Sequence, residues 1–177
     1  MILWTIRHKE AYIDMLRTGS LRANNNYLFC QDDFPEAYNW MAQQIRERIS
    51  EPPDGVQYPV WLWHTWEDER KRPDMRKNWY GDKGTPIVLL TVDVPDNAVL
   101  LSDFDTWHFV LSNAYLPKNK EDDRPHSIEE TRKSWNQIFD IFSPDKDKYC
   151  GPTSSIQATT WEIRREWVKK AEFFISK

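Results

Sequence analysis

The sequence is poor in the residues that build several common kinds of site. It has only five glycines in 177 residues, and none of them lies in a Walker loop or in the glycine fingerprint of dinucleotide-binding α/β domains. No serine nucleophile elbow is present either. The two cysteines, Cys30 and Cys150, form no C-x-x-C pair and no zinc-ligand spacing. These absences argue against a glycine-built phosphate cradle and against a structural zinc site.

Long apolar runs and an excess of positive charge are also missing. No run approaches the ~20 apolar residues that cross a bilayer, so we expect no membrane partner. The 24 basic residues are outnumbered by 28 acidic ones, giving a net charge of −4, which disfavours tight nonspecific binding to duplex nucleic acid. The chain does not open with a basic segment followed by an apolar one, and together with the isolated cysteines this favours a cytoplasmic protein.

Tryptophan, in contrast, is abundant. The chain has ten tryptophans, each of which supplies a large contact area and an N–H group that needs a partner. Two interpretations stay open: a heavily aromatic core, and a pocket with aromatic walls. The length and the even composition favour a single domain over residues 1–177.

Hydrophobic periodicity predicts an α+β domain with a mixed, mostly antiparallel sheet and flanking helices. The nearly continuous apolar segment 87–94, bounded by prolines, predicts a buried central strand. Gly19 is placed to end a preceding helix in a left-handed cap. The other expected elements are strands at 3–6, 58–66, from 99, 156–163 and 173–175, helices around 11–18, 34–49, 104–111 and 127–142, and a turn or short helix at 164–170.

The segment 58–66 is the most distinctive part of the chain because aromatic residues alternate along it. In a strand, Trp61 and Trp63 share one face, whereas Leu62 and His64 point to the other. We therefore predict that the two indoles form one wall of the principal pocket.

The segment 103–108 places two carboxylates and an imidazole close together. Asp103, Asp105 and His108 have oxygen and nitrogen atoms that can bind a divalent metal. Their spacing matches no metal-ligand motif, and acidic residues at the start of a helix are explained by capping and by the helix dipole. We expect no metal, and we place Asp103 and Trp107 among the ligand-binding candidates because a strand leads into a helix there.

Four segments carry a resemblance to a known family: LWTI, PPDGVQYPVWLWHTW, VLLSDFDTWHFVL and IQATTWEI. Over nearly the whole chain they resemble a bacterial family described as domain of unknown function 3841. That resemblance implies a shared fold and no particular activity.

The order of the elements is similar, more distantly, to the ADP-ribosyltransferase fold, including its DNA-modifying branch. This resemblance implies that NAD is the substrate and that an Arg or His on the first strand binds it. A Glu on a late strand would stabilise the ribose from which nicotinamide departs. Glu162 matches the catalytic Glu, and Thr5 stands where the fold has its Arg or His. Arg7 lies two residues further on and shares the face of Thr5. The expected site has Glu162 as the catalytic residue, facing the same cleft as its dinucleotide contacts: Thr5, Arg7, Trp61, Trp63, Asp103 and Trp107.

A second function class stays open. In a single-stranded nucleic-acid module of the small-barrel type (PUA/ASCH-like), without NAD chemistry, Trp61, Trp63 and Trp66 would stack unpaired bases. Such a module needs its phosphate contacts beside the aromatic face. The candidates are the cations of the following loop, Arg70, Lys71, Arg72, Arg76 and Lys77.

Overall fold

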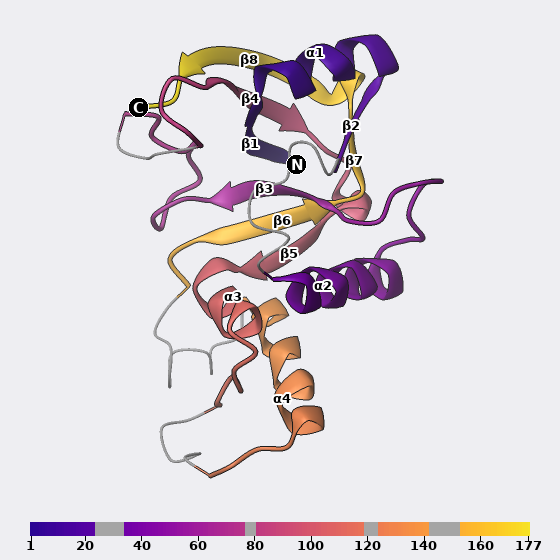
Figure 1. The fold of residues 1–177 in the computed structure, drawn as a ribbon, viewed down its shortest axis with the longest axis vertical. Coiled ribbons are helices and arrows are strands. Elements are labelled where there is room, and N and C mark those ends of the chain that lie inside the picture. Colours follow the sequence, from indigo (N-terminus) through magenta and orange to yellow (C-terminus); the bar gives the residue numbers. More distant parts are fainter. Residues whose placement is uncertain (24–33, 77–80, 119–123, 142–152) are drawn as a thin grey trace.

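A computed structural model shows an α+β domain built on a mostly antiparallel sheet (Figure 1). It describes residues 1–23, 34–76, 81–118, 124–141 and 153–177. Six strands form the main sheet in the order β5-β6-β3-β1-β4-β8, and every neighbouring pair is antiparallel. Two short strands, β2 and β7, form a separate small sheet. Cys30, Lys77, Phe142 and Cys150 lie outside the described residues.

The elements follow the predicted order through most of the chain. The strands are β1 Ile2–His8, β2 Ser20–Arg22, β3 Val60–Thr65, β4 Pro86–Asp93, β5 Leu100–Asp103, β6 Ile156–Thr160, β7 Glu162–Arg164 and β8 Val168–Ile175. The helices are α1 Lys9–Thr18, α2 Pro35–Arg48, α3 Phe104–Leu111 and α4 Ile128–Ser134. Short 3-10 helices are η2 Asp96–Ala98, η3 Trp135–Phe139 and η5 Arg165–Trp167.

Strand β4 confirms the prediction of a buried strand, although it lies next to the sheet edge rather than at its centre. Val88, Leu90 and Val92 are fully buried on one face of it, between β1 and β8. They belong to a first hydrophobic core, which α1 covers with Ala11 and Met15. In Figure 1, α1 lies over the β1–β4–β8 part of the sheet. Burial of both the strand and the helix face stabilises this half of the domain through the hydrophobic effect.

Helix α1 ends where the sequence predicted. Gly19 adopts a left-handed conformation, with φ 91°, and its N–H donates a hydrogen bond to the Met15 carbonyl. A residue with a Cβ is strained at such a φ, so glycine suits this position. The chain leaves the cap directly into β2, which brings Arg22 beside the late strand β7.

A second hydrophobic core lies beside β3, β6 and β5, where α2, α3 and η3 pack together. Trp107, Trp135 and Trp161 are almost completely buried there, which accounts for part of the tryptophan content. The capping box at the start of α4 is formed as predicted, with Ser127 and Glu130 each bonded to the other's backbone N–H.

The C-terminal strands differ from the prediction. The expected strand 156–163 is divided at Trp161, whose buried indole donates a 2.7 Å hydrogen bond to the Ser50 carbonyl beyond the end of α2. That contact turns the chain out of the main sheet, and Glu162 therefore begins β7. Strand β8 is longer than the predicted 173–175, because an edge strand tolerates charged residues such as Lys169 and Lys170, which hide its apolar alternation.

Across the described ranges, no helix is both long and apolar enough to cross a bilayer.

Candidate functional site

Strands β1 and β3 separate soon after they meet. They pair at Trp4 and Trp63, whereas β1 pairs with β4 along its whole length from Ile2 to His8. Beyond Trp4 the backbone ladder is replaced by side chains that bond to one carbonyl of β3. The Thr5 hydroxyl donates to the Trp61 oxygen at 2.9 Å, and Arg7 Nη2 donates to the same oxygen at 2.7 Å. The structure thus brings three predicted site residues, Thr5, Arg7 and Trp61, together at the gap.

Arg7 is unusual because its half-buried guanidinium has no carboxylate beside it among the described residues. It donates to the Trp61 carbonyl, Tyr38 is close enough to interact with its charge, and its buried Nε has no hydrogen-bond partner. Burial lowers the pKa of Arg7 from 12.5 to about 10, and Tyr38 partly opposes that shift. A half-buried cation with an unmet donor is a frequent mark of a functional site.

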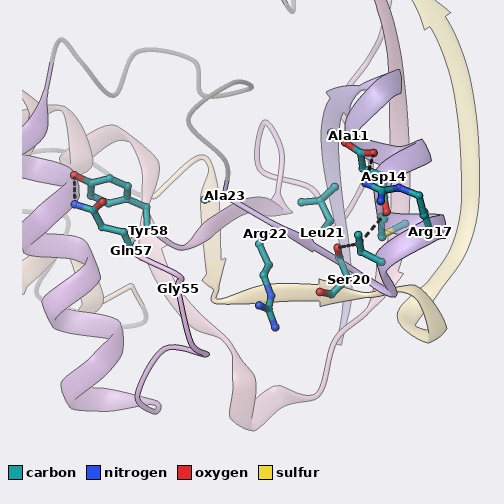
Figure 2. A pocket seen from close by; sticks show the side chains of 12 residues that line it. Ala11, Asp14, Arg17, Ser20, Leu21, Arg22, Ala23, Gly55, Gln57 and Tyr58 are labelled. Carbon is teal, nitrogen blue, oxygen red and sulfur yellow. Dashed lines mark hydrogen bonds and ion pairs between the residues drawn. The ribbon is translucent and has the colours of Figure 1, made fainter.

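A cavity, called here the larger cavity, lies between the α1–β2 segment and the chain that leads into β3 (Figure 2). Its volume is about 650 Å³, within the range of sites for small molecules and cofactors. Figure 2 shows the Arg22 side chain between the β2 wall and the segment that carries Gln57 and Tyr58. The lining residues are Ala11, Asp14, Met15, Arg17, Thr18, Ser20, Leu21, Arg22, Ala23, Gly55, Gln57 and Tyr58.

Aromatic rings connect this cavity to Arg7. Tyr58 of the cavity wall meets Tyr38 of α2 edge to face, with ring centroids 6.5 Å apart. Tyr38 in turn is the group whose charge interaction with Arg7 raises the pKa of that arginine. Arg7 therefore lies behind the tyrosine wall of the larger cavity rather than on its surface.

Glu162 lies at the edge of the smaller cavity, which has a volume of about 270 Å³. Its side chain is only 13% exposed, and each carboxylate oxygen accepts from an arginine. Arg22 Nε and Nη2 lie 3.0 and 2.9 Å from Oε2, and Arg164 Nε lies 3.1 Å from Oε1. Residues that line the smaller cavity are Ser50, Glu51, Pro52, Pro53, Ala98, Thr160, Trp161, Glu162, Arg164 and Trp167.

The position of Glu162 differs from the sequence expectation. It was expected on a strand facing the first strand, in one cleft with Thr5 and Arg7. It lies instead on β7, which pairs with β2, and its carboxylate meets Arg22 and Arg164. The division of the strand at Trp161 is the cause. Arg22, which pairs with this carboxylate, lines the larger cavity. Glu162 is therefore linked to that cavity through Arg22.

The tryptophan strand shows the predicted alternation. Leu62 points into the first core, whereas Trp61 packs on the other face against the second. The Trp61 ring contacts Tyr38 and Trp107, with centroids 5.9 and 4.9 Å away. Trp63 instead contacts Trp66 and Phe104, at 4.5 and 4.9 Å. Neither indole lines the two cavities described above, because neighbouring aromatic rings cover their faces.

Asp103 and Trp107 have structural partners of their own. The Asp103 carboxylate is buried at the start of α3, where it accepts from the Thr106 N–H at 2.9 Å and from the Thr153 hydroxyl at 2.6 Å. Trp107 is 3% exposed in the second core. Capping and packing therefore explain both residues. In the described part of the chain, no group of three or more His, Cys, Asp or Glu side chains is arranged to hold a metal ion.

The cations that follow β3 form local contacts. Arg70 lies over the Trp4 ring, 5.2 Å from its centroid, and donates to the carbonyls of His64 and Ile2. The remaining described cations of this loop pair with carboxylates: Lys71 with Glu67 and Glu69, Arg72 with Glu172, and Arg76 with Asp74. The positive charges of these loop residues are therefore balanced by carboxylates of the protein itself.

Sequence reasoning missed Arg22 and Tyr58. Arg22 matters because it is directly opposite Glu162 on the paired strand. The two residues are 140 positions apart in the sequence, so no local sequence pattern predicts their pairing. Tyr58 was seen only as the start of an aromatic strand, whereas it ends up on the cavity wall.

Comparison with known families identifies the class of this domain. The family model described as domain of unknown function (DUF3841) matches residues 2–133, which is most of the chain. The chain belongs to that family. A comparison with curated proteins found no match. The family's description assigns no activity, so a function has to be argued from the site.

Proposed function

We propose that this protein binds NAD in and beside the larger cavity and breaks the glycosidic bond to nicotinamide, as an ADP-ribosyltransferase-like enzyme or an NAD hydrolase. The observation that carries the proposal is Arg7, a half-buried cation at the gap between β1 and β3 that has no carboxylate partner among the described residues. Its lowered pKa corresponds to a free-energy cost of about 3 kcal/mol for keeping the charge buried. An anionic ligand in the larger cavity, on the other side of the tyrosine wall, would offset part of that cost through its charge.

The surroundings of Arg7 also suit a dinucleotide. The cavity of about 650 Å³ is large enough for a nucleotide, and Arg17 and Arg22 supply guanidinium groups on its wall. Guanidinium groups bind phosphate oxygens in a bidentate manner. Tyr58 adds an aromatic surface for a base or a ribose. Thr5 stands where the ADP-ribosyltransferase resemblance implies an Arg or His, and in this proposal Arg7, on the same face of the first strand, supplies the cation instead.

Glu162 takes the catalytic role in this proposal. When the bond between the ribose C1′ and the nicotinamide nitrogen breaks, the bonding electrons leave with the neutral nicotinamide and positive charge develops on the ribose. A fixed carboxylate stabilises that charge. An acceptor oxygen, from water or from a second substrate, then bonds to C1′ and releases its proton to solvent. Glu162 is held by β7 at the smaller cavity, and its ion-pair partner Arg22 lines the larger one.

The stacking module has less support. Trp61 and Trp63 use their ring faces and edges on neighbouring aromatic residues. Apart from Arg70, which lies over Trp4, the described cations of the loop after β3 pair with carboxylates, so a phosphate backbone would have to displace those carboxylates. The experiment therefore includes single-stranded nucleic acid, so that it also tests this alternative function.

The experiment incubates the purified protein with NAD and with NADP, alone and with single-stranded DNA, RNA or lysate, and follows nicotinamide by mass. We expect nicotinamide release from wild-type protein and a matching ADP-ribose product or adduct. Tight binding of single-stranded nucleic acid without any nicotinamide release would favour the stacking module instead.

A further inference from the structure

The two arginines on Glu162 pose a chemical problem for the proposed function. Arg22 occupies Oε2 and Arg164 occupies Oε1, so two positive charges face one negative charge. A carboxylate neutralised in this way stabilises a developing ribose cation only weakly. The ligand-free arrangement must therefore change before Glu162 can act.

The two arginines differ in what else they contact. Arg164 lies over the Trp167 ring, 5.4 Å from its centroid, and lines the smaller cavity. Both side chains are partly exposed, Arg22 at 43% and Arg164 at 55%, so exposure does not distinguish them. Their surroundings do, because Arg22 lines the larger cavity and Arg164 does not. Of the two, Arg22 is therefore the one that can turn toward a ligand in the larger cavity.

We infer that Arg22 is a positioning residue that exchanges partners: the pyrophosphate of a bound dinucleotide takes its guanidinium and thereby releases Oε2 of Glu162. The inference rests on the proposed function for its catalytic consequence, whereas the exchange itself requires only an anion in the larger cavity. An exposed ion pair contributes little stability, so it is exchanged readily. Phosphate offers the guanidinium two oxygens in a geometry that matches its paired N–H groups.

The exchange makes catalysis by Glu162 depend on whether a ligand occupies the larger cavity. Glu162 is neutralised while the larger cavity is empty and becomes available once a pyrophosphate occupies it. Ligands without a pyrophosphate, such as nicotinamide riboside, would leave the Arg22–Glu162 pair intact. The proposed site thereby selects for dinucleotides.

The first test follows the Nε–H signals of arginine by NMR in the full-length 15N-labelled protein. The probes are ADP-ribose and inorganic pyrophosphate, and the Arg22→Lys and Arg164→Lys variants assign the two signals because lysine lacks that group. We expect both probes to shift the Arg22 signal and to leave the Arg164 signal nearly unchanged. An unmoved Arg22 signal at saturating ADP-ribose would overturn the inference.

The second test measures ADP-ribose affinity by calorimetry in matched variants. Loss of a charged hydrogen-bond partner predicts that Arg22→Gln weakens binding by about tenfold or more, that Arg22→Lys recovers part of the loss, and that Arg164→Gln changes affinity less than about twofold. Thermal melts show whether each variant is folded. Equal affinities in Arg22→Gln and wild type would overturn the inference.

The two proposals fail separately. If Arg22 responds to ADP-ribose as described but no nicotinamide is released from NAD, the exchange stands and NAD cleavage fails. If nicotinamide is released at an unchanged KM in Arg22→Gln, cleavage stands and the role of Arg22 is wrong. With both correct, Arg22→Gln raises KM for NAD about tenfold but does not lower kcat at saturating NAD, because the neutral glutamine no longer neutralises Oε2 of Glu162.

Discussion

Arg22 and Glu162 are directly opposite each other on β2 and β7, and Arg22 Nη2 lies 2.9 Å from Glu162 Oε2. This pair joins the strand that follows α1 to the strand that follows β6, across 140 residues of sequence. Of the pair, Arg22 lines the larger cavity and Glu162 the smaller. The candidate site thus draws on the small sheet as well as on β1 of the main sheet.

Arg7→Met separates a ligand-binding role from a structural one. Methionine removes a half-buried, unpaired charge while keeping a long apolar side chain, and such replacements are often neutral or stabilising. Loss of the bond to the Trp61 carbonyl costs about 1 kcal/mol in the other direction. We expect the free energy of unfolding, measured in urea, to stay within about 1–2 kcal/mol of wild type while ADP-ribose binding is lost. A variant that unfolds but whose residual folded fraction binds normally would assign Arg7 to the fold.

Leu90→Asp tests the buried strand β4. Leu90 is completely buried between β1 and β8, so an aspartate there places an unpaired charge in the first core. We expect a destabilisation of about 4 kcal/mol or more, a large part of the stability of an ordinary domain, seen as a much lower urea midpoint or as loss of folded protein by circular dichroism. Leu90→Met provides the control, because it conserves volume and should cost less than about 1.5 kcal/mol. Cooperative unfolding of soluble Leu90→Asp protein near the wild-type midpoint would contradict the assignment.

Asp103→Ala distinguishes a helix cap from a cofactor contact. The carboxylate accepts from Thr106 N–H and from the Thr153 hydroxyl, so its removal should lower the free energy of unfolding by about 1–2 kcal/mol. ADP-ribose affinity should stay unchanged when it is measured well below the melting temperature. A large loss of affinity without loss of stability would return Asp103 to the ligand site.

His64 makes stability depend on pH in a mildly acidic range. Burial, and secondly the charge of Arg70, lower the pKa of His64 from 6.5 to about 4. Between pH 6.5 and 4 the unfolded chain therefore binds more protons than the folded one, and the free energy of unfolding falls as the pH is lowered. The full pKa difference sets an upper limit of about 3 kcal/mol. Because the imidazole is only partly buried, solvent screening reduces the expected change to about 1–2 kcal/mol.

The matched variant for that measurement is His64→Gln, which keeps a polar side chain beside the Thr65 hydroxyl but does not titrate. Urea unfolding at pH 7 and at pH 4.5 should show a smaller difference in this variant than in wild type. Equal pH dependence in the two proteins would show that His64 has an ordinary pKa.

The fold could be predicted where local chemistry decides it. The apolar segment of β4, the Gly19 cap and the Ser127–Glu130 capping box each depend on neighbouring residues, and each is present. Strand β8 was predicted too short because its charged residues face solvent at a sheet edge, where hydrophobic alternation is weak.

The candidate site was less accessible to sequence reasoning. Residue alternation places Thr5 and Arg7 on one face, and the structure brings both to the Trp61 carbonyl. The break at Trp161 follows from its hydrogen bond to Ser50, a contact across 111 residues, and it moves Glu162 onto the small sheet. Partners of that kind depend on tertiary packing, so a single sequence carries no local sign of them.

The central claim, that Glu162 supplies charge stabilisation for cleavage of NAD, is tested most directly by nicotinamide release from Glu162→Gln protein. The amide keeps the shape of the side chain and loses the charge, so we expect a folded protein with nicotinamide release reduced about 100-fold or more at saturating NAD. Glu166→Gln, an exposed glutamate in η5, serves as the control with wild-type release. Release at the wild-type rate from Glu162→Gln, or no release from wild-type protein with any acceptor, would contradict the account.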